Sequence, residues 1–179
     1  MKKVLLGLLG VVIIIVLAII TTVWIVKAND AKNSDKQVVL GEGNSKNALI
    51  IYQNGRSSFS RKVAENIANG LVEDGYKVVT NQPGDFLEKD LSKYDVVLFG
   101  SPVYAGQTSL QIKKYADSIE NYGNAKVICY CIGKDKDKDE SVEFKDCFNG
   151  KAIDSFKIVK EQFDKNKNLP IEKVRSILK

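Results

Sequence analysis

The stretch DVVLFGSPVYAG, residues 95–106, contains a buried strand that runs directly into a loop. Val96 to Phe99 form an uninterrupted apolar run, which is typical of a central parallel strand covered on both faces. Gly100, Ser101 and Pro102 are expected to end the strand, because glycine adopts unusual dihedral angles and proline lacks an N–H. Ligands of open α/β sheets bind where such loops leave the carboxyl ends of the strands. One wall of a binding site is therefore expected here.

The residues before this stretch predict a βαβ unit. Residues 48–52 (ALIIY) read as a buried strand, and residues 61–77 place apolar side chains at i, i+4 and i+8, as in an amphipathic helix. Residues 77–80 read as a short second strand. Because such a crossover is right-handed and joins parallel strands, the pattern predicts an α/β fold with a doubly wound parallel sheet.

The second half of the domain is less regular. A helix is expected from about residue 109 to 122 and a strand at 125–132, whereas the connector 85–94 has only a short helical pattern. The charged loop 134–140 is too short for a full crossover helix, so a strand at 142–148 would be antiparallel or would follow a shortened crossover. Helical patterns are also present at 156–163 and 171–178.

The N-terminus carries an apolar run long enough to cross a bilayer. Residues 4–26 contain no charge, and about 20 apolar residues suffice for a spanning helix. Residues 1–27 are therefore expected to be a single-pass anchor in the cell membrane. A cleaved signal peptide is the alternative, although its apolar region is usually only about 7–15 residues long. Lysines flank the run on both sides, so the sequence leaves both orientations open.

Residues 28–47 are polar and are expected to form a flexible linker, with Val38-Val39-Leu40 as a short docking segment. Residues 48–179 are expected to be the folded domain. Six of the 27 basic and three of the 22 acidic residues lie in 1–46, so the remainder has a net charge of only +2. That balance argues against a nucleic-acid partner.

The 179 residues include no histidine, which excludes a Ser-His-Asp triad, a Cys-His pair and a histidine-containing zinc site within the chain. Cys129 and Cys131 are two apart on one expected strand and face the same side. With Cys147 they form no CxxC pattern, so they are interpreted as buried small hydrophobes. No catalytic side chain and no metal site are predicted.

The loop at 53–60 joins the first strand to the first helix of the domain. A helix N-terminus offers unpaired N–H groups and the positive end of the dipole, and therefore favours an anion. Three serines and Arg56 add donors and a charge. The alternative is that one serine merely caps the helix. The loop has neither a GK[ST] nor a GxGxxG pattern, which argues against a nucleoside triphosphate or a nicotinamide dinucleotide.

The two loops are expected at one edge of the sheet, because they follow the strands that flank the switch point of the order 2-1-3-4-5. With GRSSFSRKVAENIA at 55–68 and YDVVLFGSPVYAG at 94–106, the chain from Ala48 to about Gly133 resembles the flavodoxin family. The first motif resembles that family's phosphate loop and the second resembles its second flavin loop. FNGKAI at 148–153 resembles its last strand. The resemblance implies FMN as the cofactor.

The resemblance also implies roles for individual residues. Ser57 and Ser60 match two phosphate-loop threonines, Ser58 matches the glycine between them, and Tyr104 is the implied ring contact. Gly133 and Lys134 match the start of the third loop. In departure from the pattern, Gly55 replaces the first Ser/Thr and Phe59 is bulky for this loop. The residues expected to bind the cofactor are Arg56, Ser57, Ser58, Phe59, Ser60, Ser101, Pro102, Val103, Tyr104, Ala105, Gly106 and Gly133.

The expected function is electron transfer by a membrane-anchored, FMN-binding, flavodoxin-like protein, in which the flavin supplies the chemistry. Its implied partners are redox donor and acceptor proteins or a small acceptor. Two alternatives stay open at this point. One is a flavodoxin-fold interaction module that has lost the flavin, and the other is an FMN-dependent reductase of a quinone- or porphyrin-type substrate.

Overall fold

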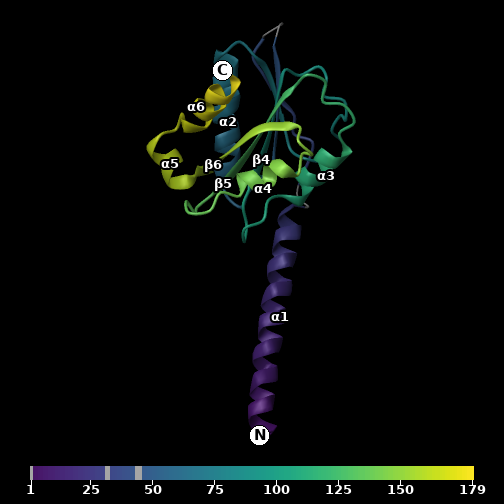
Figure 1. Cartoon of the computed structure of the whole chain (residues 1–179), viewed down its shortest axis with the longest axis vertical. Coiled ribbons are helices and arrows are strands. Elements are labelled where there is room, and N and C mark those ends of the chain that lie inside the picture. Colours follow the sequence, from purple (N-terminus) through teal and green to yellow (C-terminus); the bar gives the residue numbers. More distant parts are fainter. Residues whose placement is uncertain (1, 31–32, 43–45) are drawn as a thin grey trace. The chain divides into compact units, whose positions relative to one another are not determined.

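The computed structural model describes residues 2–30, 33–42 and 46–179, and the chain divides into two units, residues 1–32 and 33–179. The first unit contains helix α1 (Lys2–Asp30), one continuous helix (Figure 1). Its segment Gly7–Trp24 is long and apolar enough to cross a membrane, a length and composition that a signal sequence also has. The hydroxyls of Thr21 and Thr22 donate to carbonyls of the preceding turn, which suits an apolar surrounding.

The second unit is built on a six-stranded sheet with the order β1-β3-β2-β4-β5-β6. All neighbouring pairs from β3 to β6 are parallel, and counted among themselves these five strands have the order 2-1-3-4-5. The predicted fold class is therefore confirmed. The strands are β1 (Val38–Leu40), β2 (Asn47–Tyr52), β3 (Lys77–Asn81), β4 (Val96–Pro102), β5 (Lys126–Gly133) and β6 (Ala152–Val159).

Helices cover both faces of this sheet (Figure 1). Residues of α2 and α6 share one apolar core with the strands, and residues of α3 and α4 share the other. The short α5 adds Phe163 to the first core. The helices are α2 (Phe59–Glu73), α3 (Leu110–Ser118), α4 (Ser141–Asp146), α5 (Lys160–Lys165) and α6 (Leu169–Leu178).

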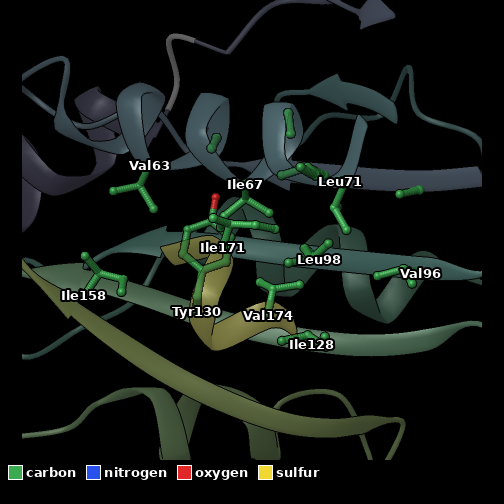
Figure 2. Close-up of a cluster of buried hydrophobic side chains, with 14 of the residues drawn as sticks. Val63, Ile67, Leu71, Val96, Leu98, Ile128, Tyr130, Ile158, Ile171 and Val174 are labelled. Atoms are coloured by element: carbon green, nitrogen blue, oxygen red, sulfur yellow. The ribbon is translucent and has the colours of Figure 1, made fainter. Parts of the chain in front are cut away.

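The alternating pleat of β4 divides its apolar run between the two cores. Leu98 faces α2 and α6, and Figure 2 shows it on the sheet below the α2 side chains Ile67 and Leu71. Phe99 faces the other side, and its ring centroid lies 4.6 Å from that of Phe148. Every residue of β4 is buried, as the continuous apolar pattern predicts for a central strand. The strand does not end at Gly100, however, but continues through Pro102, where the last position of a strand tolerates a missing N–H.

The segment 142–148 is not a strand, because it forms α4 and the turn that follows. Phe144 lies on α4 and Phe148 lies in the turn that follows, and their ring centroids are 5.4 Å apart. Both are fully buried in the core shared with Phe99. The crossover to the last strand therefore contains only a six-residue helix, and the strand it reaches is parallel, which confirms the shortened crossover.

The first half of the segment 156–163 is strand rather than helix. β6 runs to Val159, with Phe156 and Ile158 facing one core, and α5 begins only at Lys160. The alternation of Phe156 and Ile158 along the chain favours a strand here. The connector 85–94 contains no helix, and α3 ends at Ser118 rather than at residue 122.

Part of the segment expected to be a flexible linker belongs to the sheet. β1 pairs antiparallel with β3, with Val39 opposite Val79. Asn33 and Gln53 exchange two side-chain hydrogen bonds, of 2.7 and 3.0 Å. The chain therefore enters this unit beside the carboxyl end of β2. Residues 31–32 and 43–45 of the expected linker lie outside the described residues.

Candidate functional site

A cleft of about 530 Å³ lies at the carboxyl edge of the sheet, within the usual size range of small-molecule sites. Its walls come from three loops, which follow β2, β4 and β5, and from the end of β6. Ten of the predicted cofactor residues line it. They are Arg56, Ser57, Phe59, Ser60, Pro102, Val103, Tyr104, Ala105, Gly106 and Gly133.

The loop after β2 is held by its own hydrogen bonds. The backbone N–H of Gln53 donates to the carbonyl of Gly100 at 2.9 Å, and the Ser60 hydroxyl donates to the Gln53 carbonyl at 2.5 Å. Ser60 is buried, so its hydroxyl closes the loop and is already engaged as a donor. Arg56 and Ser57 are exposed just before α2 begins at Phe59. Both line the cleft, and the Ser57 Oγ accepts the Phe59 N–H at 3.4 Å, which leaves its own O–H available to donate to an anion there.

The loop after β4 is a tight hairpin. The N–H of Tyr104 donates to the Gln107 carbonyl at 3.0 Å, and the reverse bond is 2.9 Å. Ala105 and Gly106 between them have φ values of 50° and 73°, as in the two-residue turns that need positive φ at both positions. The Val103 N–H donates to the Ile132 carbonyl at 2.9 Å and ties the hairpin to β5. The wall built by this loop is thus rigidly placed.

Tyr104 joins the two loops. Its hydroxyl accepts a 2.7 Å hydrogen bond from the backbone N–H of Arg56, although the two residues are 48 positions apart. The Arg56 guanidinium lies 5.5 Å from the centre of the Tyr104 ring. At this distance a cation–π contact contributes roughly 0.5–1 kcal/mol at an exposed site. Tyr104 and the loop after β2 therefore form one braced unit.

Beyond Gly133 and Lys134, the third wall contains residues that the sequence did not single out. Glu140 ends the charged loop after β5, and Lys157 lies on β6; their side chains form a 2.6 Å ion pair and are both buried. Lys134, Asp135 and Lys160 complete this side. Lys157 interrupts the apolar run from Phe156 to Val159, and a charged residue inside a buried strand indicates a functional position. Because 156–163 was interpreted as a helix, the sequence did not indicate this position.

Two predicted residues lie away from the cleft lining. Ser101 is fully buried; its hydroxyl donates to the Pro102 carbonyl at 2.9 Å and accepts from the Ser109 N–H at 2.7 Å. It therefore ties the end of β4 to the start of α3. Ser58 occupies the N-cap position of α2 without a side-chain capping hydrogen bond, and it lies in a neighbouring groove with Lys62.

The cysteines contribute no reactive group to this site. Cys129 and Cys131 are fully buried, and burial raises the pKa of both thiols well above the ordinary value. Protonated, buried thiols are poor nucleophiles and poor metal ligands. Among the residues that the structure describes, there is no group of three or more His, Cys, Asp or Glu side chains that could hold a metal ion.

Solved structures share the fold. A flavodoxin from the domain Archaea has a TM-score of 0.55 at 16% identity, with 74% of this chain and 99% of that chain covered. A flavoprotein in complex with FMN from Lactobacillus acidophilus has a TM-score of 0.51 at 18% identity, with 68% of this chain and 98% of that chain covered. An NADH:FMN oxidoreductase in its apo form has a TM-score of 0.55 at 13% identity, with 73% of this chain and 89% of that chain covered. No curated protein matches the sequence.

A family model described as a flavodoxin domain matches residues 49–168. That range begins in β2, ends just before α6, and includes all three loops of the cleft. It covers more than half of the chain, and the observed strand order agrees with it. The chain therefore belongs to the flavodoxin domain family.

Proposed function

We propose that the cleft binds FMN and that the protein transfers electrons through it. The observation that carries this proposal is the contact between the two loops at the topological switch point, where the Arg56 N–H binds the Tyr104 hydroxyl. Bound FMN would supply the redox chemistry. The chain's own residues would bind and orient it. The structural neighbour in complex with FMN supports this choice of cofactor.

The residues present suit FMN at both ends. At the phosphate end, the N-terminus of α2, the Arg56 guanidinium and the Ser57 hydroxyl can all bind an anion. At the ring end, Pro102, Val103 and Tyr104 offer an apolar and aromatic wall. The charged residues that line the cleft are four basic and two acidic, a net charge that favours a phosphate of about −2. They are Arg56, Lys134, Lys157, Lys160, Asp135 and Glu140.

The electron acceptor distinguishes an electron carrier from an enzyme. The likeness to an NADH:FMN oxidoreductase favours, as a second candidate, an FMN-dependent reductase that uses the same cleft. A quinone- or porphyrin-type acceptor suits such an enzyme at a membrane. Steady reduction of a soluble quinone by the FMN-loaded protein with NADH would select the enzyme. A protein that does not turn over with NADH but passes electrons to an acceptor protein after reduction by dithionite would be the carrier.

Replacement of Ser57 by alanine tests the phosphate end. A hydrogen bond to a charged group contributes about 1.5–3 kcal/mol, so FMN should bind at least tenfold more weakly. Riboflavin lacks the phosphate, and its affinity should stay unchanged. Quenching of flavin fluorescence during titration measures both affinities.

Ser60→Ala is the matched control, because the Ser60 hydroxyl is buried and holds the Gln53 carbonyl. It should lower the unfolding midpoint without selecting between FMN and riboflavin. An equal loss of FMN and riboflavin affinity in Ser57→Ala would contradict the assignment of the phosphate end.

We further propose that α1 anchors the protein in the cell membrane. Its segment Gly7–Trp24 has the length and composition of a membrane span. The full-length protein should stay in the membrane fraction after a carbonate wash, and mass spectrometry should find its N-terminus intact. Release by carbonate, or a mature N-terminus near Ala28, would contradict the anchor.

A further inference from the structure

A buried ion pair forms part of the cleft wall. The Lys157 Nζ lies 2.6 Å from the Glu140 Oε2, and the two side chains are only 6% and 5% exposed. In every other ion pair of the described residues, both side chains are at least 35% exposed. The pair also lines the cleft. This is the place in the described chain where buried charge and a ligand-sized cavity coincide.

Lys157 holds the third wall together. Its ammonium also donates to the Lys138 carbonyl, and the Glu140 carbonyl accepts the Phe144 N–H at 3.1 Å. One cation thus connects β6 to the charged loop and to the start of α4. The stem of Lys157 passes Gly133, where an added Cβ would lie 3.1 Å from the Lys157 Cε. Gly133 therefore leaves room for the lysine at the cleft.

The stability of the fold alone does not explain why this ion pair is buried. Two buried charges lose their hydration, and well-packed apolar replacements are often as stable or more stable. The electrostatic effect on a neighbouring ligand is different. Charges act more strongly through a low-dielectric wall than through water. A ligand whose charge changes during function would therefore respond to Lys157 and Glu140 in opposite ways.

We propose that Lys157 and Glu140 set the reduction potential of the flavin in the cleft, the lysine raising it and the glutamate lowering it. The inference rests on the proposed function. Two electrons and one proton convert the neutral oxidised ring into a reduced anion, so a nearby cation favours reduction and a nearby carboxylate opposes it. Both residues act on the ring through the wall that they build, as positioning and electrostatic residues.

The test measures potentials in full-length protein purified in detergent and saturated with FMN. Dithionite supplies the electrons, and a reference dye reports the potential. Lys157→Met should lower the two-electron reduction equilibrium about tenfold, which is about 30 mV, and Glu140→Gln should raise it by a similar factor. The double variant should lie close to the wild type. Lys165→Met is the matched control, because the Lys165–Glu161 pair has the same 2.6 Å distance but is exposed.

The signs of the two shifts decide the result. Opposite shifts in the single variants support the proposal, and shifts of the same sign, or none, would overturn it and leave the pair as a clamp on the loop. If one single variant does not fold, the sign of the shift in the other single variant decides. The double variant is expected to fold, because it buries no unpaired charge. A wild-type protein that takes up no FMN would overturn the proposed function and this inference together. Bound FMN with unshifted potentials would overturn the inference alone.

Discussion

Replacement of Gly100 by alanine is expected to lower the free energy of unfolding by about 3 kcal/mol, at the upper end of the usual range for overpacked cores. An added Cβ at Gly100 would lie 2.1 Å from the Tyr130 Cζ and 2.2 Å from its hydroxyl oxygen. Tyr130 is fully buried and stacked on Phe156, with centroids 5.8 Å apart and planes at 14°, so its ring has no free space into which to move. For a domain of this size, the unfolding midpoint should fall by roughly 6–12 °C.

Two further variants isolate the cause. Tyr130→Phe alone should leave stability unchanged or slightly higher, because the Tyr130 hydroxyl is buried without a hydrogen-bond partner among the described residues. Combining Gly100→Ala with Tyr130→Leu should recover part of the loss by removing the ring that the methyl group meets. Full stability of Gly100→Ala by itself would contradict the pairing of Gly100 with Tyr130 on β4 and β5.

Replacement of Tyr104 by alanine is expected to weaken FMN binding by about 1–3 kcal/mol, the range measured when aromatic side chains that stack on bases are removed. The change deletes the aromatic wall and also the acceptor for the Arg56 N–H. The unfolding midpoint without FMN should change little, because Tyr104 is half-exposed on a loop. Fluorescence titration with FMN measures the first effect, and thermal unfolding measures the second.

Tyr104→Phe separates the two contributions. It keeps the ring and removes only the hydroxyl that accepts from Arg56. If the ring contacts the flavin, the phenylalanine variant should retain most of the affinity that the alanine variant loses. Equal losses in both variants would mean that Tyr104 acts by bracing the Arg56 loop. A large drop in the unfolding midpoint of Tyr104→Ala without FMN would place the residue in the structural core instead.

The apolar pattern of the sequence was sufficient for the centre of the fold. β2, α2, β3 and β4 have runs or periods of apolar residues that admit one interpretation each, and the loops after β2 and β4 follow from them. The second half was harder, because α4 is held by rings that meet only in the folded chain. β1 has three residues in a polar segment, and its partner β3 lies about 40 positions away.

The site was predictable at the level of loops and less so for single side chains. Local sequence cannot tell which serine points inward, and Ser60 and Ser101 both donate to nearby backbone carbonyls. The contact between Arg56 and Tyr104 depends on how β2 and β4 are aligned, which no local pattern contains. Lys157 and Glu140 meet only because the last crossover is short and parallel.

Thermal unfolding of the full-length protein with and without FMN tests the central claim most directly. A ligand that binds only the native state stabilises it by about 2.7 kcal/mol at a hundred times its dissociation constant, so the unfolding midpoint should rise as FMN is added. Riboflavin at the same concentration should raise it less, because it lacks the phosphate that α2, Arg56 and Ser57 are proposed to bind. An unfolding midpoint that does not move at any FMN concentration would contradict flavin binding in this cleft.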